Sequence, residues 1–287
     1  MNGKFCLITG ATSGIGAVTA KALAAKGATT IIVGRNENKC REMVRRISDA
    51  TGNHVVDYLA ADLSSQKDIH RLTEEFNARY GKLDVLVNNA GAKFTRRLES
   101  VDGYEMTFAL NHLAYFLLTN LLLDSMKIGR RSRIVNVASG SHGGCPGMNF
   151  DDLQCKKQYV GKRAYAQSKL ANILFTYELA RRLKGTVVTA NALHPGGVAT
   201  GFCRNNGWVG WIKHVGYHFL KGELVGPKKG ARTSIYLATS PEVEGISGKY
   251  FIDQKPVRSS AASYDEASAK RLWDVSLDLT GLAGTEF

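Results

Sequence analysis

Two side chains near the middle of the chain have the types and the spacing for proton transfer. Tyr165 and Lys169 are four residues apart, and in a helix that spacing places both on one face. An ammonium group close to a phenol favours the phenolate and lowers the tyrosine pKa. The phenol is then better matched to proton exchange with a carbonyl oxygen near neutral pH. The same spacing is common on ordinary helix surfaces, so the pair needs support from other residues.

Two further polar residues are candidates for the same site. Ser139 follows an apolar run at residues 133–137, and its hydroxyl can hold a substrate oxygen. Asn111 lies in a largely apolar stretch, where a buried amide needs hydrogen-bond partners. Two interpretations of Asn111 stay open: a structural amide of the core, and an anchor for a water that relays protons.

A glycine-rich stretch near the N-terminus predicts a phosphate site. It lies between an apolar run at residues 4–8 and a helix that Gly27 can end, and a second apolar run follows at residues 29–33. Such a turn gathers backbone N–H groups and a helix N-terminus at one point, which suits a pyrophosphate. This βαβ context favours a dinucleotide site over an ordinary strand–helix turn. The residues expected there are Gly10, Thr12, Ser13, Gly14, Ile15 and Gly16.

The end of the second predicted strand indicates which dinucleotide binds. An NAD site usually places an acidic residue about 20 residues beyond the glycines. Here that region of the sequence holds Arg35 and Asn36 and no acidic residue. An arginine guanidinium can bind a 2′-phosphate through two hydrogen bonds. The alternative is a solvated arginine at a helix start. The sequence favours NADP(H).

Apolar runs and helical patterns alternate along the whole chain. The expected strands cover residues 4–8, 29–33, 54–61, 83–87, 133–137, 186–193 and 249–253. The expected helices cover residues 17–25, 36–50, 65–80, 102–126, 164–183, 229–239 and 264–279. This alternation predicts an α/β fold of the Rossmann type: a doubly wound parallel sheet of about seven strands with helices on both faces.

Polar residues follow several of the expected strands. They are Asp62, Asn88, Ser139 and the pair Pro195-Gly196. In a parallel sheet ligands bind beyond the carboxyl ends of the strands, so the chemistry is expected along one rim. Asp102 and Glu105 have the spacing of a capping box, which we interpret as the start of the helix toward Met126.

Length and composition limit the remaining possibilities. The 287 residues fit one large α/β domain or two small ones. Because no linker separates the expected elements, we expect a single dinucleotide-binding catalytic domain over 1–287. Five cysteines, an odd number without a CxxC pair, indicate no disulfide framework and no metal site. The first strand leaves no room for a cleavable signal, and the apolar run 113–123 is too short to span a bilayer. We therefore expect a cytoplasmic protein.

The net charge of +13 raises nucleic acid as a partner. The basic residues are scattered in pairs along the chain, however, and no basic tail or nucleic-acid motif is present. A solvated basic surface is the better interpretation, and no nucleic-acid partner is expected.

Residues 201–227 form the longest stretch outside the alternating pattern. Trp211 and Phe219 belong to an apolar helical face, and basic residues occupy the opposite face. We interpret 201–227 as a lid that covers the substrate and excludes water. The alternative is a helix packed on the domain. The basic face of 206–221 is also suited to peripheral contact with an anionic membrane.

Taken together, these motifs resemble the short-chain dehydrogenase/reductase family in its compact, single-domain form. The resemblance rests on the Thr-Gly-x-x-x-Gly-x-Gly turn at 9–16, Asn-Asn-Ala-Gly at 88–91, Ser139, the Tyr165-x-x-x-Lys169 pair and Pro195-Gly196. It covers nearly the whole chain. The sequences of segments 149–153, 168–172 and 194–198 further resemble the retinol-dehydrogenase-like branch.

The resemblance implies a role for each matching side chain. Tyr165 would be the acid in reduction and the base in oxidation, and Ser139 would orient the carbonyl. Asn111 would anchor a relay water, while Lys169 would tune Tyr165 and contact the nicotinamide ribose. Ala138 stands where many members have a second serine. Further residues implied at the NADP(H) site are Asp62, Leu63, Asn89, Ala90, Gly91, Tyr165, Lys169, Pro195, Gly196, Val198 and Thr200.

The implied activity is that of an NADP(H)-dependent carbonyl reductase or alcohol dehydrogenase acting on a small apolar substrate. Retinoids, steroids, quinones, lipid aldehydes and xenobiotic ketones all suit such a pocket. Two alternatives are an NADP(H)-binding regulatory or scaffold protein and a sugar-nucleotide epimerase or dehydratase. Proteins of the family that this chain resembles commonly form homo-oligomers through the helices around Asn111 and Tyr165, and the oligomeric state of this chain stays open.

Overall fold

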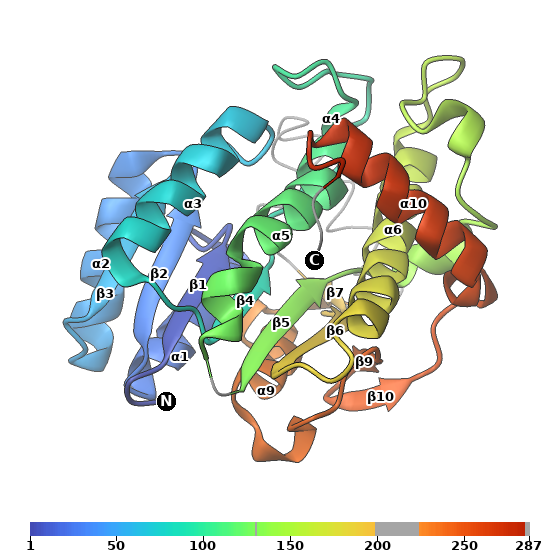
Figure 1. The fold of residues 1–287 in the computed structure, drawn as a ribbon. Helices are drawn as coiled ribbons and strands as arrows, with labels where there is room; N and C mark the ends of the chain where they lie inside the picture. Colours follow the sequence, from blue (N-terminus) through green and yellow to red (C-terminus); the bar gives the residue numbers. More distant parts are fainter. Residues whose placement is uncertain (130, 199–223, 285–287) are drawn as a thin grey trace.

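A computed structural model describes residues 1–129, 131–198 and 224–284. Its main sheet has eight strands in the order β10, β9, β6, β5, β4, β1, β2, β3 (Figure 1). The strands are β1 (Phe5–Thr9), β2 (Thr29–Gly34), β3 (Val56–Ala60), β4 (Val85–Asn88), β5 (Ser132–Val137), β6 (Val188–His194), β9 (Tyr250–Ile252) and β10 (Lys255–Val257). All neighbours are parallel except β9 and β10. The predicted doubly wound parallel sheet is confirmed.

The eighth strand is the difference from the expected sheet. The chain reverses at Asp253 and Gln254, whose φ angles are +47° and +65°, and β10 returns antiparallel along β9. Two consecutive residues in the left-handed region form the tight turn that suits a β-hairpin. The sequence carries no glycine there to signal it.

Helices cover both faces of the sheet, and alternate strand residues face alternate sides. The helices are α1 (Gly14–Ala25), α2 (Glu37–Thr51), α3 (Gln66–Tyr80), α4 (Met106–Phe108), α5 (Ala114–Lys127), α6 (Gly161–Arg182), α8 (Pro227–Gly230), α9 (Arg232–Thr239) and α10 (Glu266–Leu279). Leu7 packs in the core shared with α3, α5 and α6, whereas Cys6 and Ile8 pack with α1, α2 and α9 (Figure 1). This period of two is the pleat of a strand buried on both sides.

The capping box expected at Asp102 is wrong. The helix begins at Met106, and the buried Glu105 carboxylate caps it by accepting from the N–H groups of Thr107 and Phe108 at 2.9 and 2.7 Å. The Asp102 carboxylate instead accepts from the Gln66 N–H at 2.9 Å, at the start of α3. A carboxylate is favourable at any helix N-terminus, so packing decides which helix it serves.

A π-helical turn, Ala109–Leu113, joins α4 to α5 and carries Asn111. The whole stretch Met106–Lys127 has the length and hydropathy of a membrane span. However, 83% of its most apolar window is buried inside the fold, as in the core helix of a globular protein. It is longer than the 113–123 run identified from the sequence, because the π turn continues the helix toward its N-terminus.

The C-terminal helix α10 packs against α5 and α6 (Figure 1). Its Trp273 ring centroid lies 5.0 Å from that of Phe116 and 5.8 Å from that of Phe175, and the Arg182 guanidinium lies over the indole. These rings belong to the main core on that side of the sheet.

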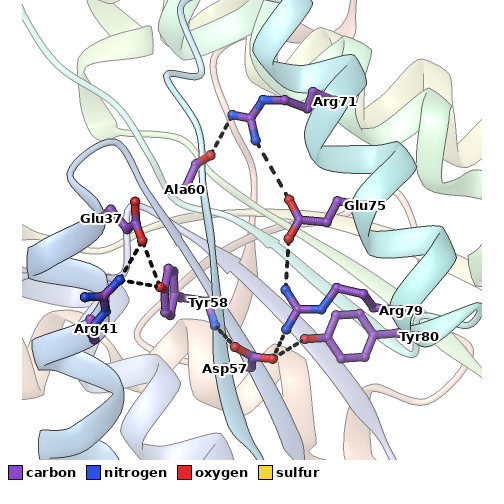
Figure 2. Close-up of polar contacts among 9 residues, drawn as sticks. All are labelled: Glu37, Arg41, Asp57, Tyr58, Ala60, Arg71, Glu75, Arg79 and Tyr80. Atoms are coloured by element: carbon purple, nitrogen blue, oxygen red, sulfur yellow. Dashed lines mark hydrogen bonds and ion pairs between the residues drawn. The ribbon is translucent and has the colours of Figure 1, made fainter.

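Charged side chains cover the open edge of the sheet at β3 (Figure 2). Asp57 binds the Arg79 guanidinium and accepts from the Tyr80 hydroxyl at 2.7 Å. Arg71 donates to the Ala60 carbonyl at 2.7 Å. Such exposed pairs contribute little stability, but they discourage another strand from adding to the edge.

Candidate active site

Three of the expected groups converge where β5 ends. The Lys169 Nζ donates to the Val137 carbonyl at 2.9 Å, and Ser139 follows Val137 by two residues. The same Nζ lies 5.9 Å from the centroid of the Tyr165 ring. Helix α6 therefore presents Tyr165 and Lys169 to the strand end that carries Ser139, because their four-residue spacing places both on one face.

Lys169 is almost completely buried, with 3% of its surface exposed. Because burial penalises the ammonium form, the pKa of Lys169 is lowered to about 7. Near neutral pH both of its protonation states are accessible. A group of this kind can take up or release a proton within the site.

A tyrosine that the sequence analysis did not single out also lies at this lysine. The Lys169 Nζ is 5.5 Å from the centroid of the Tyr115 ring. The Tyr115 hydroxyl is buried and has no hydrogen-bond partner among the described residues. Burial, reinforced by Tyr165, holds the pKa of Tyr115 well above its usual range. Its spacing of four residues from Asn111 is a helical signal that could have pointed to it.

Asn111 is held by three hydrogen bonds to protein atoms. Its Oδ1 accepts from the Ala92 N–H at 2.9 Å, and its Nδ2 donates to the Ala92 carbonyl at 2.9 Å and to Ser168 Oγ at 3.0 Å. A Cβ on Gly91 would lie 3.1 Å from Asn111 Oδ1 and 3.6 Å from Lys169 Nζ. The structure therefore brings Gly91, Asn111 and Lys169 together. Both hydrogens of the amide are used for structure.

Ser139 caps a short 3-10 turn, Gly140–Gly144. Its Oγ accepts from the Ser141 N–H at 3.2 Å and lies 3.3 Å from Ser141 Oγ. Its side chain is partly exposed at the end of the strand. The hydroxyl is thus accessible, although it is engaged with Ser141.

The glycine turn has the shape that close approach of a phosphate requires. Gly10 and Gly14 have φ angles of +64° and +58°, which suit glycine. A Cβ on Gly16 would lie 2.5 Å from the Gly10 carbonyl oxygen, so only glycine fits there. Ser13 precedes α1 but its side chain does not cap the helix. The first N–H groups of α1 are therefore not capped by that side chain, and the turn fits a pyrophosphate.

The segment after β4 is tied to this turn through Thr9. The Thr9 hydroxyl accepts from the N–H groups of Asn89 and Ala90 at 2.8 and 2.9 Å. The Asn89 Nδ2 donates to the Thr9 carbonyl at 2.7 Å. The carboxyl ends of β1 and β4 therefore lie together at one rim of the sheet, as expected from the sequence.

Arg35 and Asp62 lie together beyond β2 and β3. Arg35 Nη1 is 3.6 Å from Asp62 Oδ2, and 79% of the Arg35 side chain is exposed. An exposed pair of this kind is weak, so the guanidinium can turn to another anion. Asn36 caps α2 by accepting from the Lys39 N–H at 3.0 Å. Leu63 is buried beside them, with 6% of its surface exposed.

The segment after β6 returns to the glycine turn. Gly196, which follows Pro195, has a φ angle of +84° and precedes a short strand, β7 (Gly197–Val198), that pairs with β8 (Leu224–Val225). A Cβ on Gly230 would lie 2.6 Å from Val198 Cγ2 and 3.4 Å from Ile15 Cγ1. Val198 and Ile15 therefore meet across Gly230.

Part of the predicted site and most of the predicted lid lie outside the described residues. Thr200 is among them, as are residues 201–223 with Trp211 and Phe219. The end of the range assigned to the lid, 224–227, comprises β8, the helix-capping residue Gly226 and the first residue of α8.

A doubly wound sheet with a glycine turn at one strand end and a tyrosine–lysine pair at another defines a nucleotide-dependent oxidoreductase. The chain belongs to the short-chain dehydrogenase family, whose sequence profile matches residues 4–207. Members of this family use nicotinamide cofactors, and this chain is an oxidoreductase of that kind.

The chain is similar to several named members of the family. It is 42% identical over 280 residues to retinol dehydrogenase 11 of Homo sapiens, with 98% of this chain and 86% of the relative covered. It is 40% identical over 287 residues to polyprenol dehydrogenase of Homo sapiens, with 97% and 86% covered. The predicted likeness to the retinol-dehydrogenase-like branch is confirmed.

Solved structures have the same fold. An uncharacterised protein from Mycobacterium paratuberculosis superposes with a TM-score of 0.77 at 32% identity, covering 98% of this chain and 94% of the other. The RhlG/NADP active-site complex of Pseudomonas aeruginosa superposes with a TM-score of 0.71 at 26% identity, covering 88% and 94%.

Proposed function

We propose that this protein interconverts an alcohol and a carbonyl compound on an apolar substrate, with NADP(H) as the cofactor. The observation that carries the proposal is the position of Lys169. It is buried, bonded to the Val137 carbonyl two residues before Ser139, and on the same helix face as Tyr165. A tyrosine and a lysine four residues apart occur on many helices. A buried lysine is much rarer, because burying its charge costs free energy, and this supports a functional role for Lys169.

The side chains divide the chemistry as follows. The nicotinamide, when bound, supplies or accepts the hydride. The Tyr165 hydroxyl gives a proton to the carbonyl oxygen in reduction and takes it back in oxidation. The Ser139 hydroxyl orients that oxygen after it exchanges its bond with Ser141 for one with substrate. Lys169, beside Tyr165, stabilises the phenolate through its ammonium form and binds the nicotinamide ribose.

The cofactor is proposed from two observations. Arg35 is exposed and paired only weakly with Asp62, so its guanidinium can grip a 2′-phosphate. The related RhlG structure contains NADP. We assign the pyrophosphate to the glycine turn at 10–16, the adenosine to Asp62 and Leu63 with Asn89 to Gly91, and the nicotinamide amide to Pro195 through Val198 and Thr200.

The substrate class is proposed from the relatives. They are named for retinol and for polyprenol, both long apolar alcohols. A retinoid, steroid, lipid aldehyde or xenobiotic ketone would have the same apolar character. Because the face proposed at 206–221 is basic, we also propose a cytoplasmic enzyme that contacts anionic membranes at its surface.

Pairing of two copies through the helices around Asn111 and Tyr165 is a further part of the proposal. Helix α10 packs on α6, so a second copy of the chain would have to contact the part of α6 that α10 does not cover. Light scattering of the full chain measures the oligomeric state directly.

The proposal is tested by following NADPH oxidation with retinal, a polyprenal, a steroid ketone and a small aldehyde. NADPH binding is measured in parallel by fluorescence. We expect turnover that prefers the long apolar carbonyls and falls by roughly 10²- to 10⁴-fold in Tyr165→Phe. Tight NADPH binding without turnover of any carbonyl or oxidation of any alcohol would favour a regulatory protein instead.

A further inference from the structure

A buried histidine beside the candidate serine joins two distant parts of the chain. His142 lies in the 3-10 turn Gly140–Gly144, three residues after Ser139. Its Nδ1 is 2.7 Å from the Ser139 carbonyl oxygen, and its Nε2 is 3.0 Å from the backbone nitrogen of Ser260. Only 5% of the histidine surface is exposed.

The two partners determine the state of the imidazole. A carbonyl oxygen only accepts, so Nδ1 must carry the hydrogen and donate to Ser139. A backbone N–H only donates, so Nε2 must be unprotonated and accept from Ser260. Only the neutral Nδ1–H tautomer satisfies both bonds. Burial also favours the neutral ring, because it lowers the pKa of His142 by more than the bond to Ser139 raises it.

Ser139 is held firmly by this arrangement. Its carbonyl oxygen accepts from the His142 ring and also from the His142 backbone N–H at 3.2 Å. The ring packs edge-on against Tyr250 of β9, with centroids 5.0 Å apart. The peptide of Ser139, and with it the direction of its Cα–Cβ bond, is therefore set by a buried ring that has little freedom to move.

The other end of the bridge leads back to the helix that carries Tyr165. Ser260 O accepts from Ser263 Oγ at 2.6 Å, and Ser263 Oγ lies 2.6 Å from Ser259 Oγ. Ser259 Oγ in turn lies 2.7 Å from the hydroxyl of Tyr177, which is on α6. The segment around Ser260 is thus fastened to α6.

We propose that His142 is a positioning residue, which holds Ser139 in register with Tyr165 by bridging the Ser139 carbonyl to the Ser260 segment. The proposal rests on the function proposed above, because it assigns the reacting hydroxyl to Ser139. His142 touches neither substrate nor cofactor in this role. It acts through the backbone of Ser139.

Two substitutions separate the two bonds of the bridge. His142→Asn keeps a donor near the position of Nδ1 and loses the contact with Ser260. His142→Gln keeps an acceptor near the position of Nε2 and loses the bond to Ser139, and His142→Ala loses both. Tyr250→Phe is the matched control, because it keeps the neighbouring ring and removes a hydroxyl that has no hydrogen-bond partner among the described residues.

The expected result is a fall in kcat of about 3- to 10-fold in His142→Ala, the size of one ordinary hydrogen bond, with unchanged NADPH affinity. Tyr250→Phe should retain the parent kcat. Because each end of the bridge contributes, His142→Asn and His142→Gln should each recover part of the lost kcat, and neither should recover all of it. Full kcat in His142→Ala would overturn the proposal.

A double variant distinguishes positioning from general stability. In a Ser139→Ala background the further change His142→Ala should lower kcat by less than twofold, because the side chain that it positions is already gone. Equal losses in both backgrounds would overturn the proposal. Nitrogen NMR of the resting protein should show His142 as the neutral Nδ1–H tautomer at pH 7. That measurement needs no turnover, so failure of the proposed function and failure of the bridge can be told apart.

Discussion

The side chains of Asn111 and Ser168 are joined by a 3.0 Å hydrogen bond, and Ser168 passes the connection to Tyr165. Ser168 Oγ accepts from Asn111 Nδ2 and donates to the Tyr165 carbonyl oxygen at 2.8 Å. The π turn and α6 are therefore linked directly at the backbone of Tyr165, the proposed proton donor. This favours a structural role for the Asn111 amide, which was one of its two interpretations.

Loss of this link should reduce stability measurably. Ser168→Ala leaves buried polar groups unpaired, and we expect the free energy of unfolding to fall by about 1–3 kcal/mol. Asn111→Ala should cost more, because the N–H and the carbonyl of Ala92 also lose their partner. Urea denaturation of both variants measures the effect. A parent-like midpoint for Asn111→Ala would show that its bonds contribute nothing net.

Tyr165→Phe tests the proposed acid. A benzene ring cannot replace a phenol as proton donor, so kcat should fall by roughly 10²- to 10⁴-fold while NADPH affinity is retained. Tyr236→Phe on α9 is the control, since its hydroxyl bonds Glu242 at 2.9 Å, away from the candidate site. If Tyr165→Phe keeps most of its kcat, the proton comes from elsewhere.

Arg35→Ala tests the choice of cofactor. A charge-assisted bond to the 2′-phosphate is worth about 1.5–3 kcal/mol, so NADPH should bind roughly 10- to 150-fold more weakly. NADH binding should change little, and Arg35→Asp should shift the preference toward NADH. Arg46→Ala, an exposed arginine paired with Glu42, is the control. Equal loss for both coenzymes would remove Arg35 from the phosphate site.

Lys169→Met should raise stability while abolishing turnover. Burial lowers the folded-state pKa of Lys169 to about 7, whereas in the unfolded chain it is near 10.4. Between those values unfolding takes up a proton, so this group makes the protein less stable as pH falls toward 7. The stability gained by the Met variant should therefore be large at pH 7 and smaller at pH 9. Thermal melts of parent and variant at pH 7, 8 and 9 measure it, and a constant difference would contradict the burial effect.

The lid assigned to 201–227 is tested by kinetics with substrates of increasing size. Replacing Trp211 and Phe219 with Ala should raise KM for bulky apolar carbonyls much more than for small ones, since an apolar cover contacts only the larger substrates. NADPH affinity should be nearly unchanged. Parallel losses for every substrate, with a lowered Tm, would indicate core packing instead.

The sequence by itself determined the features that depend on local spacing. The glycine turn, the four-residue step from Tyr165 to Lys169 and the alternation of strand and helix all follow from neighbours along the chain. The parallel sheet then follows, because βαβ units connect in one direction and bring the strand ends to one rim. Arg35 after the second strand likewise needed only its position along the chain.

Only the tertiary structure decided the partners of side chains that lie far apart in sequence. Asp102 has the spacing to cap its own helix, yet it caps α3, because that helix start lies beside it in space. Likewise, His142 accepts from Ser260, 118 residues later. Contacts between elements also decide which side chains are buried. The sequence around Lys169 does not distinguish it from an exposed helix lysine, but in the fold it is buried and bonded to the Val137 carbonyl. Local spacing selects the elements, but contacts between elements depend on the whole packed core, which no short stretch of sequence contains.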